Sequence, residues 1–328
     1  MSVRHRDAVY VLPLRSETPL DVEALSYLVG LVREVPVVLV DGSPPHVRER
    51  NAHTLPRDVV HVEAPHPVPG RNGKAQGVRR GLEVSDAPYV VVADDDVRWE
   101  PAEMARALRM LDDVDLVRPQ NAFHPLPWHA RWDTGRALVN RAVGGDWPGT
   151  LVVRRDALPP HGYADHVLFE NLELVRTVQA RGGRTRVARD LVVRRIPPAP
   201  GRFVDQRLRQ AYDSHAQPVR LVAELAVLPL LAASARRYGP VRAVAAAVVL
   251  TAGLAEAGRR RDRGTRFYPA TSAAWAPLWL AERAVLSWVA LGYRFTGGVP
   301  YGGTRIRTAA QSTRRLRREA VAAARAAA

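Results

Sequence analysis

The run from Val90 to Val97 constrains the fold most, because a short apolar stretch in it ends in three consecutive acids. Four small apolar residues predict a buried strand. Asp94, Asp95 and Asp96 follow at the carboxyl end of that strand, which is where open α/β sheets bind ligands. Adjacent carboxylates repel one another unless a cation lies among them, and hard oxygen ligands suit Mg²⁺ or Mn²⁺. An acidic turn on a solvated surface is the simpler alternative, because turns favour Asp.

Strand-like and helix-like segments alternate along the first two thirds of the chain. The segments that predict strands are 8–14, 36–40, 59–62, 89–93, 151–153, 185–188 and 191–193. The segments that predict helices are 18–32, 73–84, a helix opened by Pro101, 166–180 and 202–215. Residues 41–45 read as a turn. Such alternation predicts an α/β fold with a mostly parallel, doubly wound sheet.

The charge and composition of the chain limit its partners. The net charge of +15 suggests anionic partners, but the arginines are spread along the whole chain and no nucleic-acid motif appears. We therefore expect no nucleic-acid partner. The lack of cysteine excludes disulfides, zinc–thiolate sites and thiol nucleophiles. Lys74 is the single lysine among 48 basic residues, which indicates either an ammonium placed beside a phosphate or chance retention.

Three apolar, Ala-, Leu- and Val-rich segments follow residue 218, at 221–235, 241–257 and 273–293. A membrane span needs roughly 20 apolar residues, and a charge at its centre is costly. Glu224 interrupts the first segment, and Glu282 with Arg283 interrupts the third. Flanking arginines and tryptophans favour membrane association, inserted or interfacial, over a soluble helical subdomain.

The order of the motifs resembles glycosyltransferase family 2, whose members have the GT-A fold. A strand ends at Asp41, the run 72–77 (NGKAQG) opens a helix, and a second strand ends at the acids and Arg98. Residues 93–104 (ADDDVRWEPAEM) are similar to the signature of the branch that contains ceramide glucosyltransferases and hopanoid-pathway glycosyltransferases. The resemblance covers roughly 8–215.

The resemblance implies a domain organisation. Residues 1–217 would form a GT-A glycosyltransferase domain with a Rossmann-like sheet. Residues 218–307 would form the apolar, membrane-associated helical region. Residues 308–328 form a basic tail, either a helix or disordered, to which we assign no chemistry.

The resemblance also implies roles at the donor site. Asp96 would hold a Mg²⁺ or Mn²⁺ ion, with Asp94 reaching the metal or the ribose, and Asp95 belongs to the donor-binding set. Asp41 matches the position that binds the nucleotide base, although a plain turn Asp is the alternative. Lys74 would lie near the base or the phosphates, where the simpler interpretation is ordinary helix capping.

An inverting transfer needs a general base that takes the proton of the acceptor hydroxyl. The family usually places a Glu-Asp pair at a helix start, with the Asp as base. Here the matching pair is Glu170-Asn171, and an amide cannot act as a base. Glu170 is then the best candidate. Asp165 and Glu173 are reserves, although Glu173 is expected to be a solvated helix residue.

The branch carries a Q/R-x-x-R-W motif on a later helix. Gln206 and Arg209 match the Gln and the Arg, but the Trp is missing. Arg209 could clamp the donor diphosphate in a bidentate manner. A solvated face of a basic helix is the alternative.

The expected function is therefore a metal-dependent, inverting glycosyltransferase. It would use a nucleotide-diphospho-sugar, with UDP as the first expectation, and a lipid or membrane-proximal acceptor. The enzyme would lie at the cell membrane with its catalytic domain facing the cytoplasm, where donors are made and where arginine clusters are favoured. The alternatives are a sugar-phosphate nucleotidyltransferase, a transferase relic that only binds donor, and a basic membrane-binding protein.

Overall fold

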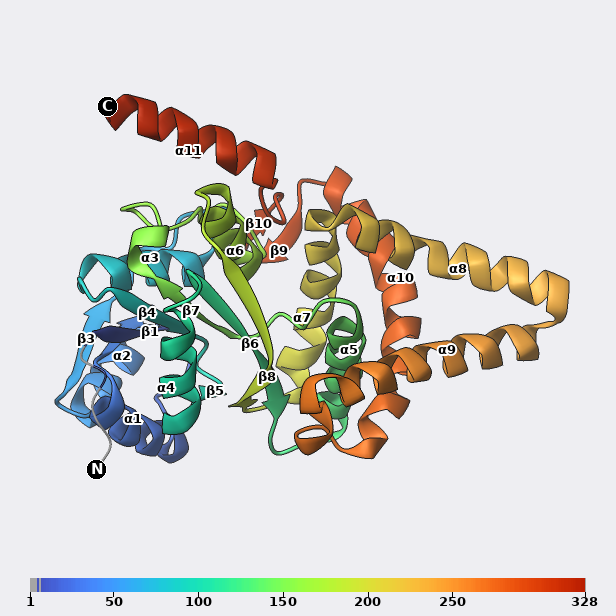
Figure 1. Cartoon of the computed structure of the whole chain (residues 1–328), viewed down its shortest axis with the longest axis horizontal. Coiled ribbons are helices and arrows are strands. Elements are labelled where there is room, and N and C mark those ends of the chain that lie inside the picture. Colours follow the sequence, from blue (N-terminus) through green and yellow to red (C-terminus); the bar gives the residue numbers. More distant parts are fainter. Residues whose placement is uncertain (1–4, 6, 328) are drawn as a thin grey trace. The chain divides into compact units, whose positions relative to one another are not determined.

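The computed structural model describes residues 5 and 7–327 and shows two compact units (Figure 1). The first unit combines Met1–Pro119, Pro148–Arg186 and Gln311–Ala328. The second combines Gln120–Trp147 and Val187–Ala310. Each unit is therefore assembled from separate stretches of chain. The domain boundaries expected at 217 and 307 stay predictions.

An α/β sheet forms the centre of the first unit, so the α/β part of the predicted fold class is confirmed. Its strands are β1 (Ala8–Leu14), β2 (Val37–Asp41), β3 (Val59–Glu63), β4 (Tyr89–Ala93), β7 (Thr150–Arg154) and the beginning of β6 (Leu116–Phe123), in the order β3-β2-β1-β4-β7-β6. The strands β3, β2, β1 and β4 are parallel to their neighbours. β7 is antiparallel to both β4 and β6, so the parallel order expected from the alternation ends at β4.

The helices of the first unit mostly follow the predicted pattern. They are α1 (Val22–Glu34), α2 (Pro45–Thr54), α3 (Gly73–Glu83), α4 (Pro101–Met110), α6 (Glu170–Ala180) and α11 (Thr313–Ala327). α2 corrects the sequence interpretation, which stopped at a turn. Pro45 stands in its first turn, where the fixed φ of proline favours a helix start.

α3 packs unusually close to the sheet because two glycines face β1. A Cβ on Gly77 would lie 2.9 Å from the Cβ of Pro13, and a Cβ on Gly81 would overlap Val11. In the sheet order β3-β2-β1-β4, successive strands are added on one side of β1 up to β3 and then on its other side at β4. Such a switch point opens a crevice at the carboxyl ends of the strands. α3 begins, and β4 ends, at that edge of the sheet.

The carboxyl-terminal segment completes the first unit. The backbone N–H of Gln311 donates to Glu173 Oε2 at 2.7 Å, and Arg176 Nη1 donates to the Gln311 carbonyl at 2.7 Å. Glu173 is fully buried on α6, and burial raises the pKa of its carboxyl group. The expectation that Glu173 is a solvated helix residue was therefore wrong.

The second unit is mainly helical. It holds α5 (Trp128–Val143), most of β8 (Thr185–Arg195), α7 (Pro200–Tyr212), α8 (Pro218–Tyr238), α9 (Pro240–Arg260), α10 (Ala276–Phe295) and the hairpin of β9 (Val299–Tyr301) and β10 (Thr304–Ile306). α8 and α9 form a helical hairpin that projects from the other helices of this unit (Figure 1). The single strand β8 replaces the two short strands predicted at 185–193.

α5 is a buried helix that the sequence did not reveal. Its enclosed faces carry charged groups instead of a clean apolar stripe. Asp133 lies between Arg136 and Arg207, at 2.7 Å from each. Burial alone would raise the pKa of Asp133, but the two guanidinium groups hold it well below the usual range. Arg141 is also fully buried and donates to the Arg189 and Arg261 carbonyls at 2.9 Å.

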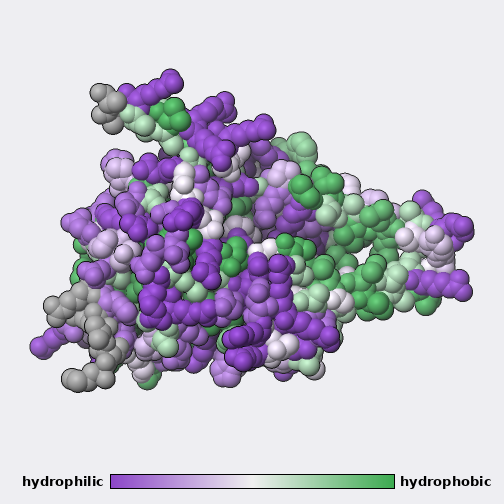
Figure 2. Space-filling view, in the orientation of Figure 1, coloured by the Kyte–Doolittle hydropathy of each residue, from purple (hydrophilic) through white to green (hydrophobic). Residues whose placement is uncertain are grey.

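The hairpin of α8 and α9 exposes much apolar surface. Within the described residues, Pro218–Tyr238 and Pro240–Arg266 are long and apolar enough to cross a membrane, and only 6% and 22% of their apolar windows are buried. Figure 2 shows this surface as a largely hydrophobic region along α8 and α9, with hydrophilic residues at the hairpin end. Val219 and Val241 are 87% and 80% exposed. A face of this kind marks an interaction surface.

Gly258 is expected to be essential to the packing of α9 on α5. A Cβ at this position would overlap the Leu138 carbonyl of α5, so Gly258→Ala should cost about 1–3 kcal/mol of stability. Gly253 on the same helix has nothing within 4 Å, so Gly253→Ala should stabilise the protein by about 0.5–1 kcal/mol. Thermal unfolding of both variants in one detergent tests this pair. Equal shifts would contradict the packing of α9 on α5.

Candidate functional site

The three acids form a turn directly after β4. The backbone N–H of Asp94 donates to the Gly149 carbonyl at 2.7 Å, and the N–H of Val97 donates to the Asp94 carbonyl at 3.2 Å. All three acid side chains are partly exposed. The turn is therefore fixed by its own backbone while its carboxylates stay accessible to a ligand.

Arg98 links the acid turn to α1. Its Nη1 donates to the Asp95 carbonyl at 2.7 Å, and its Nη2 pairs with Glu23 at 2.5 Å. The guanidinium also lies over the Tyr27 ring, 4.8 Å from its centroid. The conformation of the acid turn thus depends on α1, which carries Glu23 and Tyr27.

Lys74 joins two of the predicted site residues. Its ammonium is 2.5 Å from Asp94 Oδ1 and 2.7 Å from Glu170 Oε1. The three side chains are only 14–20% exposed. Burial alone would lower the pKa of Lys74, but the carboxylates of Asp94 and Glu170 raise it well above its usual range. Lys74 is therefore a permanent cation that bridges the acid turn and α6.

Asn72 explains how Lys74 reaches this position. Its Oδ1 accepts from the N–H groups of Lys74 and Ala75, which caps α3. Its Nδ2 donates to the Leu168 carbonyl at 3.0 Å, just before α6 begins. The cap therefore fixes the start of α3 to the start of α6. An Asn that caps a helix can be recognised in the sequence. Its side-chain contact with the Leu168 carbonyl cannot.

Asn171 connects α6 to the loop that precedes β7. Its Nδ2 donates to the Pro148 carbonyl at 2.9 Å, and its Oδ1 lies 3.4 Å from Lys74 Nζ. An Asp could not donate to a carbonyl in this way. The departure from the Glu-Asp pair thus adds a structural contact, which sequence reasoning did not predict.

The acid turn has the donor chemistry for a hard divalent cation. A Cβ on Gly149 would lie 2.5 Å from Asp94 Oδ2, so this glycine keeps space open beside the carboxylate. Among residues 5 and 7–327, no group of three or more His, Asp or Glu side chains could hold a metal. Mg²⁺ in nucleotide sites usually takes one or two carboxylates and completes its shell with phosphate and water. Asp94 and Asp96 fit that pattern.

Asp165 lies near the site but has other partners. Its Oδ1 is 2.5 Å from Arg71 Nη1, and its Oδ2 is 3.3 Å from Arg79 Nη1. Its carbonyl accepts from the Asn72 N–H. These contacts hold the segment before α3 in place. The role of Asp165 as a reserve base stays a prediction.

Asp41 ends β2 as expected and is fully buried. Its Oδ2 contacts Asn51 Nδ2 at 2.9 Å and His61 Nε2 at 3.1 Å, and its Oδ1 accepts from the Ser43 N–H. Burial alone would raise the pKa of Asp41, but hydrogen bonds from Ser43 and Asn51 lower it. Its role at the nucleotide base stays a prediction.

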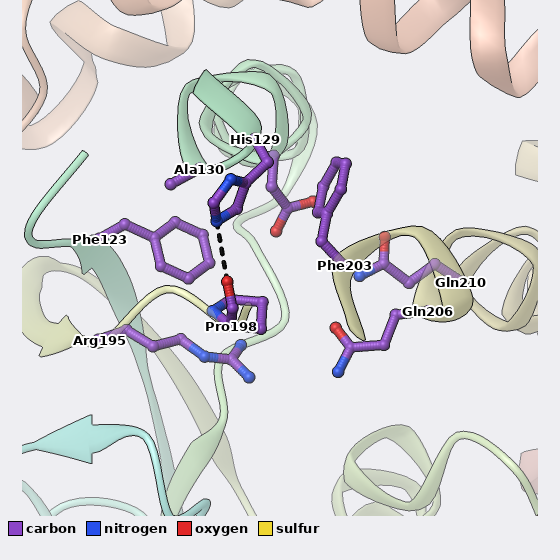
Figure 3. A pocket seen from close by; sticks show the side chains of 9 residues that line it. Phe123, His129, Ala130, Arg195, Pro198, Phe203, Gln206 and Gln210 are labelled. Carbon is purple, nitrogen blue, oxygen red and sulfur yellow. Dashed lines mark hydrogen bonds between the residues drawn. The ribbon is translucent and has the colours of Figure 1, made fainter. Parts of the chain in front are cut away.

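Gln206 and Arg209 belong to the second unit, on α7. Gln206 lines a cavity of about 30 Å³, together with His129 of α5 and Arg195 of β8 (Figure 3). His129 bonds the Pro198 carbonyl at 2.8 Å there. The cavity has room for water, and not for a sugar. The guanidinium of Arg209 lies 5.7 Å from the centroid of the Tyr301 ring.

Arg207, one of the residues inside the motif, is the arginine with a buried network. Its Nη1 contacts Asp133 at 2.7 Å, and its Nε contacts Glu282 at 2.8 Å. Such pairing indicates a structural role for Arg207. The clamp expected of Arg209 stays a prediction.

Comparison with known proteins relates the chain to solved glycosyltransferases. No protein-family model and no curated protein sequence matches it. A mannosyltransferase from Pyrobaculum calidifontis, solved with GDP-mannose and Mn²⁺, matches 87% of this chain and 88% of its own at 19% identity, with a TM-score of 0.51. Glucosyl-3-phosphoglycerate synthase from Mycobacterium tuberculosis, with Mn²⁺ and UDP-glucose, covers 63% of this chain and 78% of its own at 20% identity, with a TM-score of 0.43. The first likeness shows that this chain has the GT-A-type fold.

Loss of the Lys74 ammonium should destabilise the first unit. Lys74→Met leaves the carboxylates of Asp94 and Glu170 without their counter-ion, at a cost of about 2 kcal/mol. Lys74→Met combined with Glu170→Gln should lose less, because one of the two charges is gone. Denaturant midpoints of the single and double variants give the coupling. An unchanged midpoint in Lys74→Met would contradict the bridge.

Proposed function

We propose that this chain is a metal-dependent glycosyltransferase that moves a sugar from a nucleotide-diphospho-sugar to a lipid or membrane-proximal acceptor, with inversion. The observation that carries the proposal is the convergence of Asp94, Lys74 and Glu170 at the carboxyl end of β4. Acids for a metal, a cation for a phosphate and a candidate base stand there within one contact network.

The likeness to the Pyrobaculum mannosyltransferase supports this proposal. The two chains share a fold over most of their lengths, and that enzyme was solved with a nucleotide-sugar and Mn²⁺. UDP remains the first nucleotide to test and GDP the second. The finer assignment to the ceramide and hopanoid branch rests on the residue pattern at 93–104.

Asp94 and Asp96 would hold Mg²⁺ or Mn²⁺ in this scheme. The ion would neutralise the charge that builds up on the diphosphate leaving group. The side chain of Asp95 supplies a third carboxylate. The backbone carbonyl of Asp95 accepts a hydrogen bond from Arg98. Arg98 keeps the turn in one conformation, so the acids need little reorganisation when the donor binds.

Lys74 and Glu170 would divide the remaining work. With donor bound, the ammonium of Lys74 can turn toward the diphosphate, because phosphate oxygens compete with Glu170 for it. Glu170, released from its ion pair with Lys74, would then take the acceptor hydroxyl proton on its carboxylate. Donor binding would thus prepare the base for the second substrate.

The exposed hairpin of α8 and α9 supports a membrane-proximal acceptor. Its apolar windows are largely unburied, and Arg236, Arg237 and Arg242 stand where the two helices meet. We propose that this region associates with the cell membrane and that the catalytic part faces the cytoplasm.

Binding of donor without turnover is the second candidate. The absence of an Asp at position 171, and the ion pair that occupies Glu170, favour it. A transfer assay separates the two candidates.

Asp96→Asn should abolish the metal dependence of nucleotide binding. The neutral amide is a poor ligand for Mg²⁺ or Mn²⁺, so affinity measured with metal should fall at least about tenfold, to the metal-free level. Calorimetry with UDP, GDP and their sugar conjugates, with and without Mn²⁺, measures it. Asp112→Asn removes an equal but exposed charge and should change nothing. Normal metal-dependent binding by Asp96→Asn would refute the ligand assignment.

Glu170→Gln should keep donor binding and lose transfer. General-base catalysis is worth about 10²–10⁴-fold, so turnover should fall by that range. Turnover is measured as the transfer of radiolabelled sugar from the donor to a membrane-lipid extract. If Glu170→Gln retains full transfer and Asp165→Asn does not, the base lies at Asp165.

A further inference from the structure

A large apolar cavity lies between α8, α9 and α10 of the second unit. Its volume is about 740 Å³. Its walls are mainly Leu, Val and Ala side chains, among them Leu231, Val248 and Leu280. None of the predicted donor-site residues lines this cavity, and the proposed sugar transfer does not use it.

The polar lining of this cavity is confined to one end. Ser234 and Tyr238 stand in the last turns of α8, and Arg242 stands in the first turn of α9. Arg236 and Arg237 are exposed beside them, and residues 225–255 contain no acid. Within the part of the chain that the structure describes, the Arg242 guanidinium has no ion pair or hydrogen bond. The cavity therefore has apolar walls and a cationic end.

An apolar space of this kind favours an apolar occupant. Apolar walls do not hold ordered water, and an unfilled space forfeits the dispersion contacts of its lining. From Val227 to Tyr238, α8 runs about 17 Å, which is close to the reach of one hydrocarbon chain. Because the polar end of the cavity is cationic, a complementary occupant carries an anionic group next to its hydrocarbon.

We propose that the cavity binds one acyl chain of an anionic membrane phospholipid, with its phosphate against Arg242. The inference rests on the membrane association in the proposed function. The bound lipid fills the space between α8 and α9, and its headgroup neutralises the arginines at the hairpin end. It is a lipid ligand of the hairpin, separate from the sugar acceptor.

Native mass spectrometry of the full chain, purified in detergent from a membrane fraction, tests the proposal. We expect one retained phospholipid per chain. Ala247→Phe fills the cavity and should lower the retained fraction about tenfold. Ala245→Phe, on an exposed position of α9 outside the cavity, is the matched control and should retain the lipid. Ala246→Leu, a smaller filling, repeats the test if Ala247→Phe does not fold.

The charge is tested with phosphatidylglycerol and phosphatidylcholine added to delipidated protein. Arg242→Gln should weaken retention of phosphatidylglycerol about fivefold and leave phosphatidylcholine unchanged. Arg318→Gln removes an equal charge from an exposed position on α11 and should have no effect. A lipid-free wild type, equal retention by Ala247→Phe and Ala245→Phe, or a dimer that closes the cavity would overturn the proposal.

Nucleotide binding, measured on the same samples, keeps the two claims apart. Binding of donor without retained lipid refutes only the lipid site. Retained lipid without donor binding refutes the transferase and leaves the lipid site in place.

Discussion

The ammonium of Lys74 is the interaction on which the candidate site depends. It joins the acid turn after β4 to the start of α6, because Asp94 and Glu170 are both bound to it. Without a cation, two partly buried carboxylates would face each other there, which is unfavourable. The close packing of α3 through Gly77 and Gly81, and the Asn72 cap, serve to hold this ammonium in place. In a chain with 47 arginines, this position between two carboxylates carries the compact ammonium of the single lysine.

Much of the first unit could be predicted because its signals are local. The strands β1, β2 and β4 are continuous apolar runs, and α1, α3 and α4 carry recognisable starts. α5 could not be predicted, because its enclosed faces carry the buried Asp133 and Arg141 and the largely covered Arg136. Asp133 and Arg136 pair with each other on α5, and Arg207 of α7 adds a second partner for Asp133. Periodicity identifies apolar faces and has no means to find buried ion pairs.

The sequence singled out the charged residues of the candidate site. It did not predict the contacts that hold them in place. The acids, Lys74 and Glu170 were found because their order along the chain is distinctive. The contact of Asn171 with the Pro148 carbonyl and the space that Gly149 leaves beside Asp94 were not predicted, because both depend on residues distant in the sequence. At Arg207 and Arg209, the motif singled out Arg209, whose role stays a prediction, while the buried ion pairs of Arg207 were not foreseen. Which of two neighbouring arginines faces inward depends on helix packing.

The return of the chain to the first unit at Gln311 sets an order of events during synthesis. α6 is not complete until Gln311 donates to the buried carboxylate of Glu173. The apolar hairpin of α8 and α9 leaves the ribosome before that donor exists, by a lag on the order of seconds at ordinary translation rates. The exposed apolar helices of the second unit are thus synthesised before the segment that completes the first unit. A chain of this design therefore finishes its first unit only after its apolar hairpin has been made.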